Sequence, residues 1–169
     1  MIYRMRYDSP LGELTLDSKD NKLIGLWFNG QKHFSGSFDE KTIECDDLEV
    51  FEKTKEWLDS YFNGNNPSMD DLNLSLKGSE FQLKVWDLLK DIPYGEVVTY
   101  GDIAKRISLN MSSQAVGGAV GHNPISVIVP CHRVIGSNGN LTGYAGGLEN
   151  KVKLLKLEGV EIRDLKVIF

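Results

Sequence analysis

The sequence predicts an α+β protein built from two domains, and three observations support this fold class. Residues 1–34 alternate between apolar and polar side chains and are interrupted by turn residues, which is typical of β-hairpins. Residues 46–62 change to a helical period of three to four. From Ser79 onward a helix, a short second helix, a turn and a third helix follow closely. We place the boundary at Gly78–Ser79, which gives domains of residues 1–77 and 78–169.

The first domain is expected to combine hairpin strands with one helix. The strands are expected at residues 3–7, 14–16 and 22–28, with turns at 9–12 and 20–21. The helix over 46–62 has Asp46 or Asp47 as its N-cap, and Gly64 lies beyond its end. Residues 72–76 read Leu-Asn-Leu-Ser-Leu, and this clean alternation predicts one more strand.

The second domain contains signals for a helix-turn-helix. Ser79 and Gln82 predict a capping box on a helix that Pro93-Tyr94-Gly95 stops. A second, short helix over 100–107 follows Thr99 as its cap, and after a turn Ser112 or Ser113 caps a third helix that runs to about Val120. Further elements are expected as a hairpin turn at 136–140, whose flanking strands would form a wing, and a closing helix over 149–157.

The helix that begins near Ser113 has almost no side-chain bulk. Its small residues are Ala115, Gly117, Gly118, Ala119 and Gly121. Each glycine costs about 1 kcal/mol of helix propensity, so this density indicates the close approach of another structure. The approaching structure is either another helix of the same domain or the groove of a nucleic acid, and the composition leaves both open.

A run of β-branched residues, 125–129, ends at Pro130 and is followed by Cys131 and His132. The run predicts a buried strand that delivers a thiol and an imidazole to a turn. A cysteine is nucleophilic as its thiolate, and an adjacent imidazole is a suitable proton acceptor. The alternative is structural, because free cysteines are among the most buried residue types and pack as small hydrophobes.

Composition and charge exclude several functional classes. The net charge is −5, yet no acidic residue occurs between Ile103 and Gly147, a stretch that contains Lys105, Arg106 and Arg133. This stretch either faces a polyanionic partner through a small footprint or is simply buried. No apolar run approaches the roughly 18 residues that span a bilayer, and the N-terminus does not resemble a secretory signal. We therefore expect a cytoplasmic protein without a membrane partner.

Cysteine and histidine positions do not predict a metal site. The two cysteines, Cys45 and Cys131, are expected to be free thiols, and the histidines at 33, 122 and 132 lack zinc-ligand spacing. The glycine-rich loop at 143–147 does not open a helix after a strand, so it does not predict phosphate binding. No metal and no cofactor are expected.

Four segments together resemble a known family. Pro-Cys-His-Arg-Val at 130–134 is preceded by Gly-Ala-Val-Gly-His-Asn-Pro at 118–124 and followed by Gly-Tyr-Ala-Gly-Gly at 143–147 and Leu-Glu-Gly at 157–159. This pattern closely resembles the O6-alkylguanine-DNA alkyltransferases. The resemblance covers about half of the chain, and the first half fits more loosely, chiefly through Ser-Pro-Leu-Gly at 9–12. It implies a ribonuclease-H-like N-terminal domain and a winged-helix-like C-terminal domain that enters the DNA minor groove and flips the damaged guanine outward.

The resemblance also implies a role for each residue that matches the family pattern. Cys131 would accept the alkyl group, His132 would take its proton through a bridging water, and Glu158 would bond the other ring nitrogen. Tyr100 would donate to guanine N3 as the leaving group gains charge, and Asn123 would brace the backbone around the thiol.

Further residues would bind the base and the DNA. The carbonyls of Cys131 and Val134 and the loop of Tyr144, Ala145 and Gly146 would line the guanine pocket, with Lys151 holding this loop. The small-residue helix would meet DNA through Gln114, Ala115, Gly117 and Gly118. Gln114 occupies the position where the family often has an arginine that replaces the flipped base, and Ala145 stands where many members have serine.

The expected reaction is DNA repair by stoichiometric transfer of an alkyl group from O6-alkylguanine in double-stranded DNA to Cys131. A thiolate suits in-line displacement at an alkyl carbon, and the resulting thioether is stable, so each molecule, expected to be a monomer, would act once. The sequence leaves open whether O4-alkylthymine is also a substrate. Two alternatives are a helix-turn-helix damage sensor or regulator without transfer, and a cysteine hydrolase that uses Cys131 and His132.

Overall fold

The computed structural model describes residues 1–31 and 41–169. It divides into two compact units, Met1–Lys77 together with Pro124–Ile128, and Gly78–Asn123 together with Val129–Phe169. Residues 32–34 of the predicted hairpin region, including His33, lie outside the described residues. Within the described ranges no helix is both long enough and apolar enough to cross a membrane.

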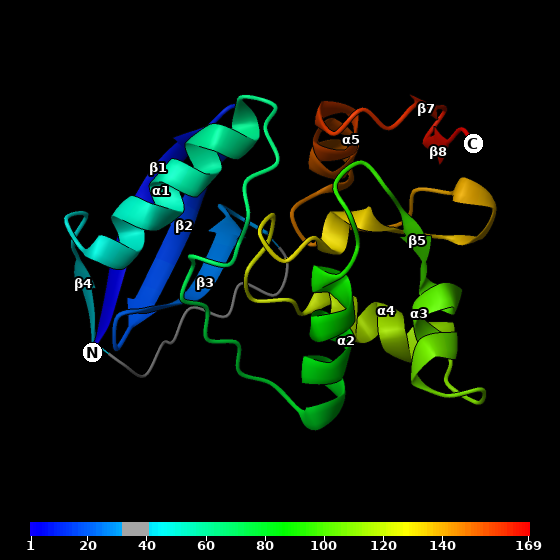
Figure 1. Ribbon diagram of the computed structural model, residues 1–169, viewed down its shortest axis with the longest axis horizontal. Helices are drawn as coiled ribbons and strands as arrows, with labels where there is room; N and C mark the ends of the chain where they lie inside the picture. Colours follow the sequence, from blue (N-terminus) through cyan, green and yellow to red (C-terminus); the bar gives the residue numbers. More distant parts are fainter. Residues whose placement is uncertain (32–40) are drawn as a thin grey trace. The chain divides into compact units, whose positions relative to one another are not determined.

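The first unit is a four-stranded sheet with one helix across it (Figure 1). Its elements are β1 (Ile2–Ser9), β2 (Gly12–Lys19), β3 (Lys22–Phe28), β4 (Thr42–Glu44) and α1 (Glu49–Phe62). The strand order is β3-β2-β1-β4, in which β4 pairs with β1 in parallel and the other pairs are antiparallel. The predicted strands at 3–7, 14–16 and 22–28 are confirmed, whereas β4 carried no clear signal in the sequence.

Alternation places two rows of side chains on the face that meets α1. One row crosses the strands as Tyr7, Leu14 and Phe28, and the Tyr7 hydroxyl donates to Asp59 of α1 at 2.5 Å. The next row consists of Met5, Leu16 and Leu26. The side chains of both rows are buried, so this face and α1 enclose the core of the unit.

The helix in this unit begins later than predicted. Neither Asp46 nor Asp47 is its N-cap, because α1 starts at Glu49 with Leu48 in the cap position and no side-chain cap bond. The Asp47 carboxylate instead accepts a hydrogen bond from the Cys45 thiol at 2.9 Å. Gly64 follows the helix end with φ of 89°, as the prediction requires.

Residues 72–76 do not form the predicted strand, because the edge of β3 is shared by two segments. Leu23 of β3 bonds to the first segment, donating to Asn73 and accepting from Ser75. Leu26, further along the same edge, bonds instead to residues 124–126. Each segment therefore forms a single β-bridge with β3, and a pairing of this length does not make a strand.

The run at 125–129 is buried but is not a strand. Only Ile125 bridges to β3. Val127 has φ of 71°, and the Ile128 amide donates to the Ser126 carbonyl at 2.8 Å, so the chain reverses in a γ-turn. A positive φ is a true outlier for a β-branched residue, and this strain ends any strand before the chain reaches Cys131.

The second unit consists of helices with short strand pairs. Its elements are α2 (Glu80–Lys90), β5 (Val98–Thr99), α3 (Tyr100–Ile107), α4 (Ser113–Gly121), the 3-10 turns η1 (Cys131–Arg133) and η2 (Ser137–Gly139), β6 (Val134–Ile135), α5 (Leu148–Leu157), β7 (Ile162–Arg163) and β8 (Lys166–Val167). The predicted capping box of Ser79 and Gln82 is confirmed, as are the caps at Thr99 and Ser112. The Trp86 indole donates to the Ala119 carbonyl at 2.9 Å and so ties α2 to α4.

The turn at 136–140 forms, but its two arms do not pair as the strands of a hairpin. The Gly136 amide closes the turn on the Asn140 carbonyl at 2.7 Å. Beyond it, β6 pairs in parallel with β5, and Asn140 bridges to Lys166. One physical reason is Lys151, whose ammonium bonds to a carbonyl on each side of the turn and so replaces a direct ladder bond.

Candidate functional site

Cys131 opens the short η1 turn directly after Pro130, and its side chain is buried. Its amide donates to the Val129 carbonyl at 2.8 Å, and the Asn123 amide group donates to the same carbonyl at 2.8 Å. Asn123 therefore holds the backbone that carries the thiol. The family resemblance implied this bracing role for Asn123, and the geometry is compatible with it.

The surroundings of the Cys131 thiol favour its protonated form. Burial raises its pKa, while a hydrogen bond with Asn123, the charge of Lys151 and a hydrogen bond with Tyr144 lower it in part. The net direction is upward, so the thiolate needs help to form. A proton acceptor close to the thiol is therefore part of any nucleophilic chemistry here.

His132 and Glu158 form a buried pair with neither side chain exposed. The His132 Nε2 lies 2.7 Å from the Glu158 carboxylate. Burial lowers the pKa of His132, and the carboxylate opposes that effect without reversing it. The ring is therefore neutral at rest, and the predicted contact between Glu158 and one ring nitrogen is present.

Glu158 receives four hydrogen-bond donors, two on each oxygen. Oε1 accepts from Arg133 Nε at 2.8 Å and from the Gly95 amide at 3.0 Å. Oε2 is shared by His132 and by Arg133 Nη2, the latter at 3.1 Å. Burial alone would raise the pKa of Glu158, but the hydrogen bonds from His132 and Arg133 and the charge of Arg133 lower it below its usual range. The carboxylate is thus fully saturated and ionised.

Arg133 was not predicted as a site residue. Besides the two bonds to Glu158, its Nη1 donates to the Ile92 carbonyl at 2.7 Å, and its guanidinium lies 5.8 Å from the Tyr94 ring centroid. The guanidinium is buried, so its partners must come from elsewhere in the chain. The sequence shows Arg133 within the Pro-Cys-His-Arg-Val segment and within a stretch without acidic residues, but neither observation identifies a partner for its side chain.

Lys151 of α5 is a second buried cation. Its Nζ donates to the carbonyls of Val134 at 2.6 Å and Thr142 at 3.1 Å, and it lies 5.9 Å from the Tyr100 ring centroid. Burial lowers its pKa to about 8, and the neighbouring Cys131 opposes the shift. Lys151 thereby holds the start of the loop at Thr142, and its charge favours the Cys131 thiolate.

Tyr100 is the first residue of α3, and its ring faces α4. A Cβ on Gly117 would lie 3.8 Å from this ring. Burial raises the pKa of Tyr100, and a hydrogen bond with the Thr142 side chain opposes this. The phenol is therefore a neutral donor, close enough to Cys131 for the two groups to influence one another electrostatically.

The loop over residues 143–147 is closed by one backbone bond and one side-chain bond. The Gly147 amide donates to the Tyr144 carbonyl at 2.9 Å, and the Asn150 side chain donates to the Gly146 carbonyl at 2.8 Å. Tyr144, Ala145 and Gly146 are all half-buried. Asn150 was not predicted to support this loop, because its role depends on a fold-specific contact with Gly146.

The outer face of α4 is open. Gln114, Ala115 and Gly118 are exposed, and a Cβ on Gly118 would meet nothing within 4 Å. Of the two explanations for the small residues, packing against another helix therefore fails at Gly118. Gly117 differs, because its nearest neighbour is the Tyr100 ring.

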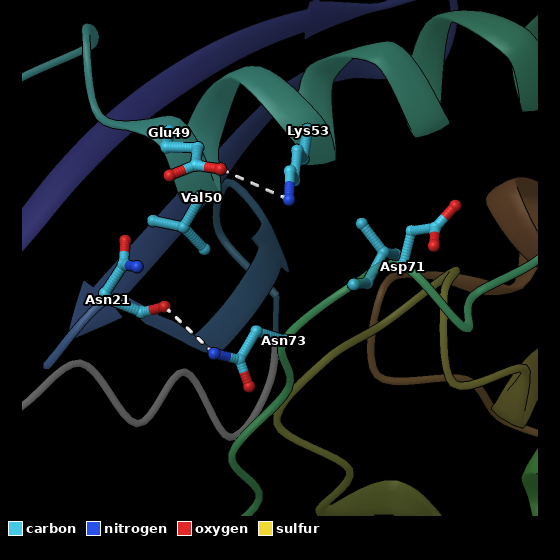
Figure 2. Close-up of a pocket in the computed structure, with 7 residues that line it drawn as sticks. Asn21, Glu49, Val50, Lys53, Asp71 and Asn73 are labelled. Atoms are coloured by element: carbon cyan, nitrogen blue, oxygen red, sulfur yellow. Dashed lines mark hydrogen bonds and ion pairs between the residues drawn. The ribbon is translucent and has the colours of Figure 1, made fainter.

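The predicted catalytic residues do not line any of the described hollows in the first unit. Figure 2 shows a cavity of about 70 Å³ in which Glu49 and Lys53 form an ion pair at 3.3 Å and the Asn73 amide bonds to the Asn21 carbonyl at 3.4 Å. All of its lining residues belong to the first unit. The thiol, the imidazole and their partners all belong to the second unit.

Comparisons with known proteins agree with this arrangement. Two family models match: 6-O-methylguanine DNA methyltransferase, ribonuclease-like domain, over residues 2–76, and 6-O-methylguanine DNA methyltransferase, DNA binding domain, over residues 80–160. These matches confirm the predicted α+β class with a ribonuclease-like first domain and a DNA-binding second domain.

Individual relatives cover nearly the whole chain. A methylated-DNA–protein-cysteine methyltransferase of Methanosarcina acetivorans is 45% identical over 163 residues, covering 94% of this chain and 99% of the relative. The protein of the same name from Haemophilus influenzae is 39% identical, with coverages of 96% and 89%. The crystal structure of Mycobacterium tuberculosis OGT in complex with DNA has a TM-score of 0.82 and 42% identity, and the match covers 92% of each chain.

Proposed function

This chain belongs to the 6-O-methylguanine DNA methyltransferase family, and we propose that it repairs DNA by moving the alkyl group of O6-alkylguanine onto its own Cys131. The chain is thus a methylated-DNA–protein-cysteine methyltransferase that acts once per molecule. The observation that carries this proposal is the buried Cys131 thiol next to His132 in the η1 turn, with Glu158 at the end of α5 bonded to the His132 ring.

The reaction is an in-line displacement in which the sulfur of Cys131 bonds to the alkyl carbon while the bond between that carbon and guanine O6 breaks. The thiol proton passes to Nδ1 of His132 through a water, because Glu158 holds Nε2. Tyr100 donates a hydrogen bond to guanine N3 as negative charge develops on the base, and the proton held by His132 is the one that the product guanine finally takes up. In the net reaction the thiol proton replaces the alkyl group on guanine.

The guanine pocket is assigned to the carbonyls of Cys131 and Val134 and to the loop of Tyr144, Ala145 and Gly146. Lys151 supports this assignment, because its ammonium fixes Val134 and the start of the loop at the same time. A carbonyl oxygen has two lone pairs, so the Val134 carbonyl can accept from Lys151 and from the amino group of guanine.

The exposed side of α4 is assigned to the DNA minor groove. Gln114, Ala115 and Gly118 leave the helix backbone accessible, and Gly117 lets the Tyr100 ring lie against the helix. Gln114 fills the gap left by the flipped base, a role that helps to offset the few kcal/mol needed to extrude a base. We assign the monomer as the form of this protein that acts on its duplex.

The cytoplasm is the location that we assign to this repair activity. Both cysteines are free in the structure. Free thiols persist in reducing compartments, and an alkyl acceptor has to remain reduced until it meets its substrate.

Intact-mass spectrometry after mixing with a duplex that contains O6-methylguanine tests the proposed function. We expect one methylene mass to be added per protein molecule and the reaction to stop at one equivalent of DNA. A damage sensor would bind the duplex without a change in mass, and a hydrolase would turn over many equivalents without a permanent adduct.

A further inference from the structure

Arg133 and His132 share one oxygen of Glu158, and this arrangement fixes the tautomer of the imidazole. A carboxylate only accepts hydrogen bonds, whereas the guanidinium of Arg133 only donates them. The hydrogen between His132 and Glu158 therefore belongs to Nε2 of the ring. A neutral ring with its hydrogen on Nε2 carries its basic lone pair on Nδ1.

The same arrangement removes most of the charge that His132 would otherwise face. Glu158 carries one negative charge, and the positively charged guanidinium of Arg133 bonds to both oxygens of that carboxylate. An imidazolium at His132 would therefore meet a pair whose charges cancel.

The other titratable groups around His132 do not restore a net negative charge. Lys151 of α5 adds positive charge that disfavours the imidazolium. The Tyr94 phenol, before β5, has its pKa raised by burial and stays neutral. Cys131 is also neutral at rest, since burial raises its pKa.

We propose that Arg133 is a positioning residue that holds Glu158 in place and keeps His132 neutral, so that His132 is ready to accept the Cys131 proton. The proposal rests on the proposed function, because it concerns the base of that reaction. It assigns to Arg133 an electrostatic role that is separate from folding. If the guanidinium were absent, the Glu158 charge would be unopposed and would favour a protonated ring, with only burial and the charge of Lys151 left to oppose it.

Two variants separate the charge of Arg133 from its shape. Arg133→Met removes the charge and keeps much of the apolar stem, whereas Arg133→Lys keeps the charge and loses the planar fork. The double variant Arg133→Met with Glu158→Gln again presents no net charge to His132, and the glutamine oxygen can still accept from Nε2. Far-UV circular dichroism confirms that each variant is folded.

Histidine-ring NMR gives a readout that does not depend on activity. The chain has three histidines, so His33→Gln and His122→Gln variants identify the His132 signals. We expect the wild-type ring to be the Nε2–H tautomer, and the pKa of His132 to rise by about one unit or more in Arg133→Met. The pKa should return toward the wild-type value in the double variant and stay near it in Arg133→Lys.

The pH dependence of the single-turnover transfer rate provides the second readout. A raised pKa of His132 moves the acid limb to higher pH, so the rate of Arg133→Met should fall about tenfold per pH unit below that limb and recover above it. Arg133→Lys should be slower by the same factor at every pH. The proposal would be overturned if the acid limb of the pH–rate profile stayed at its wild-type pH in Arg133→Met. It would also be overturned if that limb moved to higher pH in Arg133→Lys.

The two readouts also separate this inference from the proposed function. If wild-type protein gains no methyl group from damaged DNA, the proposed function fails, yet the NMR titration still shows whether Arg133 controls His132. If transfer occurs but the His132 titration is unchanged in Arg133→Met, only the inference about Arg133 fails.

Discussion

At the scale of single residues, the environment of Cys131 favours a protected thiol over a standing thiolate. Burial raises the pKa of the thiol, and burial also keeps His132 neutral. An acceptor that reacts once has no use for high general reactivity, because oxidation of a thiolate would consume it before repair. Activation is therefore expected only when the substrate has been placed against the thiol.

Tyr100 is the residue whose removal should slow chemistry without disturbing the fold. Tyr100→Phe keeps the ring that lies against Gly117 but loses the hydroxyl. We expect single-turnover transfer to slow by on the order of 10²-fold or more, with little change in DNA affinity, because a positioned acid typically contributes this much. Rapid-quench kinetics at saturating protein measure the rate, and an unchanged rate would remove Tyr100 from the mechanism.

The residues that sequence reasoning missed are those whose partners lie far along the chain. Arg133 lies in the same motif as Cys131 and His132, but nothing in that motif shows its bond to Glu158, which is 25 positions away. No local pattern specifies such a pair. A buried arginine in a segment without acids signals only that some distant partner exists.

At the scale of elements, the sequence predicts features that depend on neighbouring residues. It does not predict features that depend on two distant segments competing for the same strand edge. Caps at Ser79, Thr99 and Ser112 depend on side chains within three residues of one another, so the sequence contains them in full. The strand at 72–76 failed because another segment occupies part of the same β3 edge. That competition is invisible in the alternation of five residues.

The helix α4 offers a test of DNA binding at its Gln114. Arginine brings a charge and five donors, whereas glutamine brings two donors, one acceptor and no charge. Gln114→Arg should therefore tighten duplex binding and steepen its salt dependence by roughly one additional phosphate contact. Reaction with free O6-benzylguanine should be nearly unchanged, because a free base needs no flipping.

A matched control adds the same charge elsewhere. Asn66→Arg lies on an exposed loop of the first unit and should leave the salt dependence close to wild type. Titrations across a salt series compare the three proteins. Our placement of Gln114 fails if the free-base rate shifts as much as the duplex rate, or if affinity does not rise at low salt.

At the scale of the whole molecule, the sequence predicted two domains in series, whereas one segment of the chain returns to the first unit. Residues 124–128 bond to Leu26 of β3 through Pro124 and Ser126, although they lie between α4 and the η1 turn. A division of the chain at the single point Gly78 cannot represent a later segment that belongs to the first unit. The division into residues 1–77 and 78–169 thus stays a prediction to be tested.

A fragment of residues 78–169 should be markedly less stable than the full chain. Ile125, Val127 and Ile128 are buried in the full chain, and burial of such side chains contributes about 1.5–3 kcal/mol each. Without β3 the fragment would expose them. Thermal unfolding of the fragment, alone and with residues 1–77 added in trans, measures this effect, and equal stability of fragment and full chain would show that the segment needs no partner.

The most direct test of the central claim is the location of the adduct after reaction with O6-methylguanine DNA. Tryptic cleavage places Cys45 in residues 42–53 and Cys131 in residues 107–133, so peptide mass spectrometry separates the two cysteines. We predict methylation of the second peptide alone, unchanged in Cys45→Ser, and absent in Cys131→Ser, which should still bind DNA. A methylated peptide 42–53, or transfer that persists in Cys131→Ser, would contradict the assignment of Cys131 as the acceptor.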